Sequence, residues 1–270
     1  MMRTYCCQFD VAWEDKDENF KRVRSLLNRR KLASRSLVVL PEMFATGFSM
    51  NSGATAEPAN GPTFDFLRTL ARDKGVFVLG GLARLAAPGR IFNEAVCIAP
   101  SGRPVARYDK LHLFSPGDES RHYAPGGAIT LFRWEGLKVA VFICYDLRFP
   151  EVFRLAVGRG ANVLVVIANW PGKRQAHWTA LLRARAIENQ AYVIGVNRCG
   201  RDPSFEYGGG SLVVDPWGGT VAEAGGVEAL LPAKLDPAAL KRVRAGFPVL
   251  RDIRTRLSLE NTDGELEQRS

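Results

Sequence analysis

Strand-like and helical segments alternate along most of this 270-residue chain. Short apolar runs, such as residues 137–143 and 162–168, have the length and composition of buried strands. Between such runs lie segments with apolar side chains at helical spacing, for example residues 62–74. This alternation predicts an α/β fold built in layers. We expect strands near residues 3–9, 36–41, 76–81, 91–98, 129–132, 137–144, 162–168, 191–198 and 209–214, and helices near 15–31, 62–74, 150–158 and 174–189.

The domain organisation is expected to be simple. No Pro-, Gly- or Ser-rich linker, internal repeat or low-complexity tract divides the sequence, and its length suffices for one large domain with a sizeable core. After residues 230–237 the sequence becomes charged and irregular. We therefore assign residues 1–255 to a single domain, and residues 256–270 to a C-terminal tail that is frayed or lies at a dimer interface.

Composition indicates a soluble protein. Hydrophobic residues make up 46% of the chain and charged residues 24%, which is usual for globular proteins. No stretch approaches the roughly 20 consecutive apolar residues of a membrane span. The first ten residues lack the apolar core of a secretory signal and run directly into a strand-like segment. We expect a cytoplasmic protein without a membrane partner.

The formal net charge of +9 raises the alternative of a nucleic-acid-binding scaffold. The densest basic cluster spans residues 21–35. Within and beside it, Phe20, Val23 and Leu27 fall on one face of a helix, so the basic residues are expected to form its solvated face. No stacking-aromatic motif accompanies them, and we expect no nucleic-acid partner.

Cofactor motifs are missing from the sequence. Its five cysteines and three histidines lack the spacing of metal ligands. No phosphate-binding loop, dinucleotide-binding glycine motif or G-x-S-x-G elbow is present. We expect no metal or organic cofactor. His112, His122 and His177 are interpreted as structural hydrogen-bonding residues.

Cys144 lies where a buried strand gives way to a helix that Pro150 can begin. Its thiol would then lie near backbone N–H groups and the positive end of a helix, a setting that lowers a thiol pKa. A thiolate in that position can attack a carbonyl carbon. The alternative is a small buried apolar residue, the usual role of a free cysteine.

Two more ionisable residues follow short extended segments. Glu42 comes directly after the apolar run that ends at Pro41. A carboxylate is unfavourable at the end of a buried strand unless it is paired with another group or takes part in the chemistry of a site. Lys110 follows residues 103–109. Taken singly, each is compatible with an ordinary surface role. Together with Cys144 they supply a general base, an oxyanion stabiliser and a nucleophile, with the Tyr145 N–H as a second oxyanion donor.

A glutamate, a lysine and a cysteine at three strand ends, in this order, resemble the catalytic residues of the nitrilase superfamily of carbon–nitrogen hydrolases. The likeness covers roughly residues 2 to 250 and includes Leu-Pro-Glu42, Tyr-Asp-Lys110-Leu-His and Cys144-Tyr-Asp-Leu-Arg-Phe-Pro-Glu. It implies a four-layer α-β-β-α sandwich with two mixed sheets. It also implies hydrolysis through a thioester, with water and a small amide as substrates.

Finer features resemble the omega-amidase branch, notably residues 42–49 and 167–171. The resemblance implies hydrolysis of the distal amide of a 2-oxo dicarboxylic acid monoamide, such as 2-oxoglutaramate. Nitrilases usually carry Trp-Glu after the nucleophile, where this chain has Tyr145-Asp146, and carbamoylases carry a second arginine at the position of Leu147. A carbamoylase or a nitrilase remains the alternative function.

Further site residues are assigned by position. Glu119 aligns with a second glutamate of the superfamily and is expected to anchor Lys110 or position the amide. Arg148 could bind a substrate carboxylate, or instead form a salt bridge with Asp146 or Glu151. Four aromatic residues are candidate pocket walls or, alternatively, ordinary core: Phe44, Phe48, Phe114 and Trp170. In similar proteins the stretch matching residues 245–252 lies across a second subunit, so a homodimer is expected.

Overall fold

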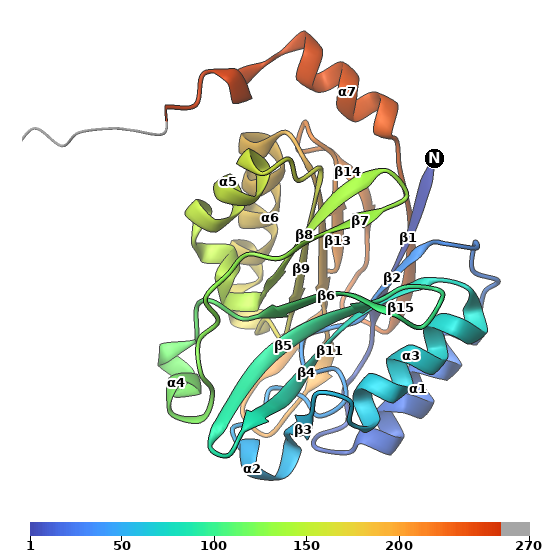
Figure 1. The fold of residues 1–270 in the computed structure, drawn as a ribbon, viewed down its shortest axis with the longest axis vertical. Coiled ribbons are helices and arrows are strands. Elements are labelled where there is room, and N and C mark those ends of the chain that lie inside the picture. Colours follow the sequence, from blue (N-terminus) through green and yellow to red (C-terminus); the bar gives the residue numbers. More distant parts are fainter. Residues whose placement is uncertain (255–270) are drawn as a thin grey trace, which may run out of the picture.

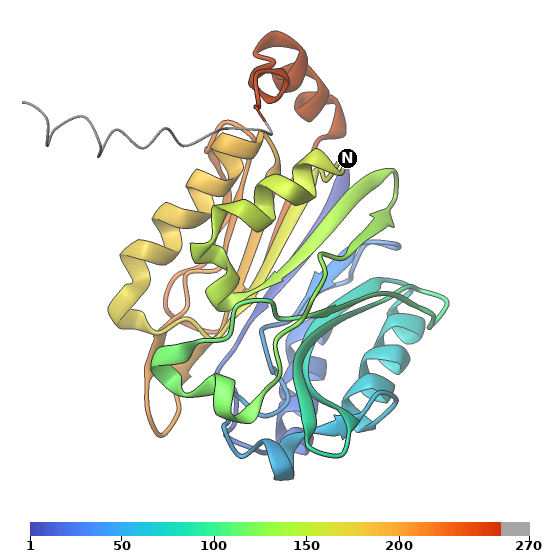
Figure 2. The same cartoon turned by 60° about the vertical axis from the view of Figure 1, so that its left-hand side comes forward.

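The computed structural model describes residues 1–254, which form four layers. Two mixed β-sheets lie face to face, and helices cover the outer face of each (Figures 1 and 2). The expected α/β sandwich with two mixed sheets is confirmed. The first sheet contains β15 (Ala229–Leu235), β1 (Met2–Gln8), β2 (Leu37–Val39), β4 (Phe77–Ala87), β5 (Arg90–Ile98) and β6 (Pro104–Asp109) in that order, and β3 (Glu57–Pro58) pairs with β4.

The second sheet has parallel strands at its centre. Its order is β14 (Thr220–Glu223), β13 (Leu212–Val214), β10 (Tyr192–Asn197), β9 (Val163–Ala168), β8 (Leu137–Ile143) and β7 (Leu131–Trp134). β8, β9 and β10 run parallel, and antiparallel strands flank them. Every residue of β9 is buried, as its uninterrupted apolar sequence requires, because the opposite sheet covers one face and helices the other.

Four long helices form the outer layers. They are α1 (Lys16–Asn28) and α3 (Pro62–Lys74) outside the first sheet, and α5 (Pro150–Gly158) and α6 (Gln175–Asn189) outside the second (Figure 2). Pro62 and Pro150 lie in the first turns of α3 and α5, where the backbone N–H has no partner within the helix, so proline loses no hydrogen bond there. The short helical segments are α2 (Ser52–Thr55), α4 (Glu119–His122), η1 (Ser115–Gly117), η2 (Cys144–Arg148), η3 (Gly172–Arg174) and η4 (Val249–Arg251).

The first part of the basic cluster, Lys21 to Arg24, lies on α1 as predicted, but α1 ends at Asn28, so the basic residues from Arg29 to Arg35 follow the helix. Val23 and Leu27 are fully buried against the first sheet, whereas Lys21 and Arg24 are exposed. The basic residues that lie on α1 therefore belong to the solvated face of a packed helix.

Several elements differ from the sequence-based expectation. The hairpin of β11 (Cys199–Arg201) and β12 (Glu206–Gly208) was not foreseen, and neither were β14 and β15. The stretch that follows residues 230–237 was expected to be irregular, and this was wrong, because α7 (Pro237–Gly246) occupies its beginning. Asp236 caps α7 by accepting from the Ala238 N–H, and Pro237 fills its first turn. α7 projects from the layered body (Figure 1).

Within residues 1–254, no helix is long and apolar enough to cross a lipid bilayer. The predicted C-terminal tail, residues 256–270, lies outside the described part of the chain.

Candidate active site

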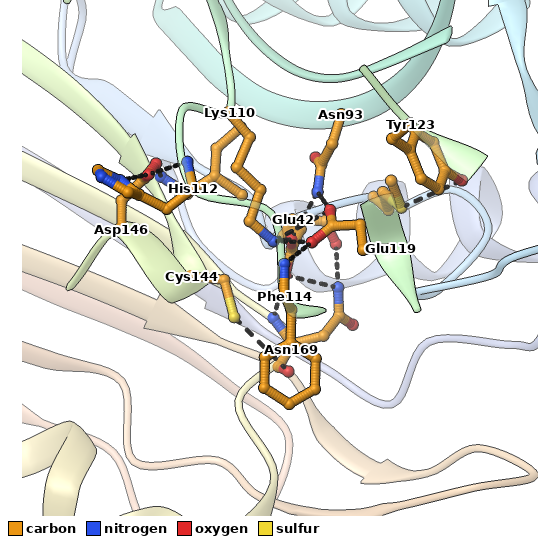
Figure 3. A network of polar contacts seen from close by, with 12 residues as sticks. Glu42, Asn93, Lys110, His112, Phe114, Glu119, Tyr123, Cys144, Asp146 and Asn169 are labelled. Atoms are coloured by element: carbon orange, nitrogen blue, oxygen red, sulfur yellow. Dashed lines mark hydrogen bonds and ion pairs between the residues drawn. The ribbon is translucent and has the colours of Figure 1, made fainter. Parts of the chain in front are cut away.

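The three predicted chemical groups meet where strands of the two sheets end. Glu42 follows β2 and Lys110 follows β6 in the first sheet, and Cys144 follows β8 in the second. Their side chains point toward one another between the sheets (Figure 3). Packing the two sheets face to face thus brings together residues that are more than 30 positions apart in the sequence.

Lys110 lies at the centre of this group. Its Nζ is 2.9 Å from Glu42 Oε1, and 3.1 and 2.9 Å from the two oxygens of Glu119. All three side chains are fully buried. Burial by itself lowers the pKa of Lys110, but the charges of Glu119 and Glu42 outweigh burial and raise that pKa above its ordinary value. Lys110 is therefore held as a cation, and Glu119 is one of its two anionic partners.

Two buried asparagines fix the carboxylate of Glu42. Asn93 Nδ2 donates to Glu42 Oε1 at 2.7 Å and to Glu119 Oε1 at 2.8 Å, which links the two acids. The Asn169 N–H donates to Glu42 Oε2 at 2.8 Å, and its side-chain amide donates to the Glu42 carbonyl at 2.7 Å. Oε2 also accepts a longer bond, 3.4 Å, from the Asn169 side-chain amide, and this weak contact is the one that an incoming proton would replace.

Cys144 occupies a sharp turn with a φ of +46°, a conformation that is unfavourable for any residue with a side chain. Its Sγ lies 3.9 Å from the Asn169 carbonyl oxygen, and the residue is partly exposed. Burial of the sulfur, followed by the charge of Glu42, raises the pKa of Cys144 well above its ordinary value, and Lys110 offsets only part of this. The lowered thiol pKa expected from the sequence was therefore wrong. The resting group is a neutral thiol that needs a base.

This protonation state predicts a pH dependence for alkylation. An ordinary cysteine ionises at about pH 8.5, and the pKa of Cys144 is raised above its ordinary value. We therefore expect the rate of iodoacetamide reaction at Cys144 to rise with pH and to show no plateau up to pH ~9. Mass spectrometry of the modified peptide measures the rate, and Cys144→Ala serves as the unreactive control. A plateau below pH 7 would indicate a preformed thiolate beside Lys110.

Asp146 ties the Cys144 turn to the strand that leads to Lys110. One carboxylate oxygen accepts from the Ile143 N–H at 3.0 Å and from the Tyr108 hydroxyl at 2.7 Å. The other accepts from the His112 N–H at 2.9 Å and lies 2.8 Å from His112 Nδ1. His112 has the hydrogen-bonding role predicted from the sequence.

A pocket opens at the sulfur of Cys144. Its space is about 380 Å³ with the opening to solvent included, and its wall contains Phe48, Phe114, Cys144, Tyr145, Arg148, Asn169, Trp170, Pro171, Arg174, Phe205 and Tyr207. Tyr145 and three of the four predicted aromatic residues therefore line it. Phe44 does not. Its ring is fully buried and packs near Phe20 and Phe66 in the core outside the first sheet.

Arg148 lies in this pocket without the salt bridge that was weighed as an alternative. Asp146 is engaged elsewhere, and residues 1–254 contain no ion pair between Arg148 and a carboxylate. Its guanidinium lies over the Trp170 ring at 4.9 Å and contacts His177 Nδ1 at 3.3 Å. The cation is therefore available to an anion that enters the pocket.

Sequence reasoning missed several residues of the site, including Asn93, Asn169 and Arg174. Asn93 carried a usable signal, because an asparagine within the apolar run 91–98 is unfavourable unless its amide is hydrogen-bonded. Asn169 directly follows β9, as Cys144 follows β8, so its position at the same sheet edge was also a signal. Arg174 had none, since it stands between two other polar residues, Lys173 and Gln175, in a segment with no apolar pattern.

No group of three or more His, Cys, Asp or Glu side chains within residues 1–254 is arranged to hold a metal ion. Glu42 and Glu119 both bind Lys110, as described above.

The family model of carbon-nitrogen hydrolases matches residues 4–245. The chain belongs to this family. The carbon–nitrogen hydrolase is 35% identical to the 2-oxoglutaramate amidase of Bacillus subtilis over 250 residues, which cover 92% of this chain and 96% of the relative. It is 36% identical to the omega-amidase YafV of Escherichia coli K12 over 247 residues, which cover 91% and 94% of the two chains.

A solved structure agrees with these relatives. A carbon–nitrogen hydrolase superfamily protein from Xanthomonas campestris, with an arsenic adduct in its active site, is similar with a TM-score of 0.90 and 35% identity. The similarity covers 96% of this chain and 99% of that one. The resemblance to omega-amidases is thus confirmed, and the protein is a carbon–nitrogen hydrolase that acts on amides.

Proposed function

We propose that this enzyme hydrolyses the distal amide of a 2-oxo dicarboxylic acid monoamide to a carboxylate and ammonia. The main support for this proposal is the fully buried Lys110, which is held between Glu42 and Glu119. The partly exposed thiol of Cys144 lines a pocket on the same site. The buried cation provides positive charge for an oxyanion, Cys144 provides the nucleophile, and Glu42 provides the base.

In the first half of the proposed reaction, Glu42 removes the thiol proton as Cys144 Sγ attacks the amide carbon. Negative charge develops on the former carbonyl oxygen, where Lys110 and the Tyr145 N–H stabilise it. The carbon–nitrogen bond breaks as Glu42 returns the proton to the nitrogen. Ammonia leaves, and the acyl group remains on the sulfur as a thioester.

In the second half, Glu42 takes a proton from water while the water oxygen attacks the thioester carbon. The carbon–sulfur bond breaks, and Glu42 returns the proton to the sulfur, which restores the neutral thiol. The raised pKa of Cys144 suits this cycle, because a proton moves to and from the sulfur in each turnover and the same carboxylate carries it.

The substrate assignment is supported by the relatives and by the pocket. The Bacillus subtilis relative is a 2-oxoglutaramate amidase, and Arg148 provides a cation that can pair with the carboxylate at the far end of such a molecule. Aromatic walls suit a short carbon chain between the two ends.

A panel of substrates tests the assignment. We expect kcat/KM for ammonia release to be highest for 2-oxoglutaramate or 2-oxosuccinamate, and at least about tenfold lower for glutamine, because the ammonium group of glutamine would lie near Arg148. Simple nitriles and N-carbamoyl amino acids complete the panel. A preference for either of these would replace the omega-amidase assignment with a nitrilase or carbamoylase, and would leave the Cys144 mechanism in place.

Assembly and location belong to the same proposal. We expect a homodimer in which α7 and the following residues contact the second subunit, since α7 stands away from the body and Phe247, beyond its end, is half exposed (Figure 1). A cytoplasmic location and the absence of a nucleic-acid partner stay predictions from composition.

A further inference from the structure

We propose that Arg174 and Arg148 together bind the 2-oxo carboxylate end of the substrate, so that Arg174 determines specificity for amides of 2-oxo acids. This inference rests on the proposed function and assigns a role to a residue that the sequence did not single out. Its basis is the placement of two guanidinium groups in one pocket wall that contains no acid.

The charged side chains that line the pocket are all positive. Its eleven lining residues include two cations, Arg148 and Arg174, and no aspartate or glutamate. Arg174, like Arg148, forms no ion pair with a carboxylate of residues 1–254. Both side chains are half-buried. Two like charges in a partly desolvated wall repel each other, and an anion between them removes that repulsion.

Each guanidinium is held against a different aromatic ring. Arg148 comes from η2, directly after the nucleophile, and lies 4.9 Å from the centre of the Trp170 ring. Arg174 comes from η3 and lies 5.3 Å from the centre of the Phe114 ring. The Arg174 carbonyl accepts from Trp170 Nε1 at 2.8 Å, which ties the two sides of the pocket together. Both guanidiniums are thus restrained before a ligand enters.

A 2-oxo acid has the acceptors that such a pair requires. Its carboxylate and the adjacent oxo group present three oxygens that can lie in one plane. One arginine fork can bind a carboxylate edge with two parallel hydrogen bonds, and a second can donate to the remaining oxygens. A plain carboxylate lacks the oxo acceptor, and a neutral chain lacks both.

Three amides of equal chain length separate these contributions: 2-oxoglutaramate, glutaramate and pentanamide. For Arg174→Gln we expect KM to rise about 10- to 100-fold for 2-oxoglutaramate, less for glutaramate, and within twofold for pentanamide, with kcat nearly unchanged. Lys173→Gln is the matched control, since it removes the same charge from the preceding residue, which is exposed and lies outside this pocket.

Equal losses on all three amides, or no loss on any, would overturn the proposal. Binding of 2-oxoglutarate to the free enzyme, measured by calorimetry, gives a second readout that needs no turnover. We expect Arg174→Gln to weaken it at least tenfold and Lys173→Gln to leave it within about twofold. Lack of hydrolysis of 2-oxoglutaramate by the unaltered enzyme would defeat the proposed function alone, whereas lack of any effect of Arg174→Gln on 2-oxoglutarate binding would defeat this inference.

Discussion

Replacement of Cys144 by alanine should lower ammonia release by at least about 10⁴-fold, because no other thiol lines the pocket and the covalent step cannot occur without one. Folding should change little, since the substitution removes one sulfur atom from a partly exposed position. In the unaltered enzyme, rapid acid quenching followed by mass spectrometry should detect an acyl group on the peptide that contains Cys144. The same peptide of Cys144→Ala should carry none.

Cys199→Ala is a suitable control. Cys199 begins β11, is almost fully buried and does not line the pocket, so its loss should leave kcat and KM within a few-fold of the unaltered values. Retention of normal activity in Cys144→Ala would exclude the thioester mechanism. Substrate protection of Cys144 from iodoacetamide would further locate the amide at this sulfur.

Replacement of Lys110 by methionine should impair both catalysis and stability. The reaction would lose the charged donor at the oxyanion, an effect of about 10²- to 10³-fold in kcat. Folding would lose about 3–5 kcal/mol, because Glu42 and Glu119 would remain fully buried without their shared cation. Urea unfolding and steady-state kinetics measure these effects.

The double variant Lys110→Met with Glu119→Gln separates the two roles. Removing one negative charge should recover part of the lost stability, because Asn93 Nδ2 can still donate to an amide oxygen at position 119. Activity should stay low, since the oxyanion still lacks its cation. Full recovery of activity in the double variant would show that Lys110 acts only by neutralising Glu119.

The sequence predicted the layered fold well, because the relevant signals are local. The helices expected near residues 62–74 and 150–158 are α3 and α5 with those bounds. Proline at each first turn and the spacing of apolar residues fix such an element within its own segment. α7 was missed although Asp236 and Pro237 are its ordinary start signals, because charge was given more weight than capping.

The aromatic residues show where local signals end. Phe44 and Phe48 are four residues apart in one loop, and both were candidate pocket walls. Met43 has a φ of +41°, and the Phe44 N–H bonds to the Gly81 carbonyl of β4, so the turn directs Phe44 into the core. Phe48 reaches the pocket, where its ring lies 5.1 Å from Lys110 Nζ. Composition and spacing could not distinguish the two rings.

The sequence by itself determined the family and, through that resemblance, the four-layer arrangement, and it placed three candidate catalytic residues after strands. Only the tertiary structure decided their electrostatic state and their partners. Asn169 binds Glu42 across 127 positions of sequence, and the sign of the pKa shift at Cys144 depends on burial between two sheets. The physical reason is that helix and strand formation depends on neighbouring residues, whereas desolvation and charge pairing depend on which surfaces the folded chain brings into contact.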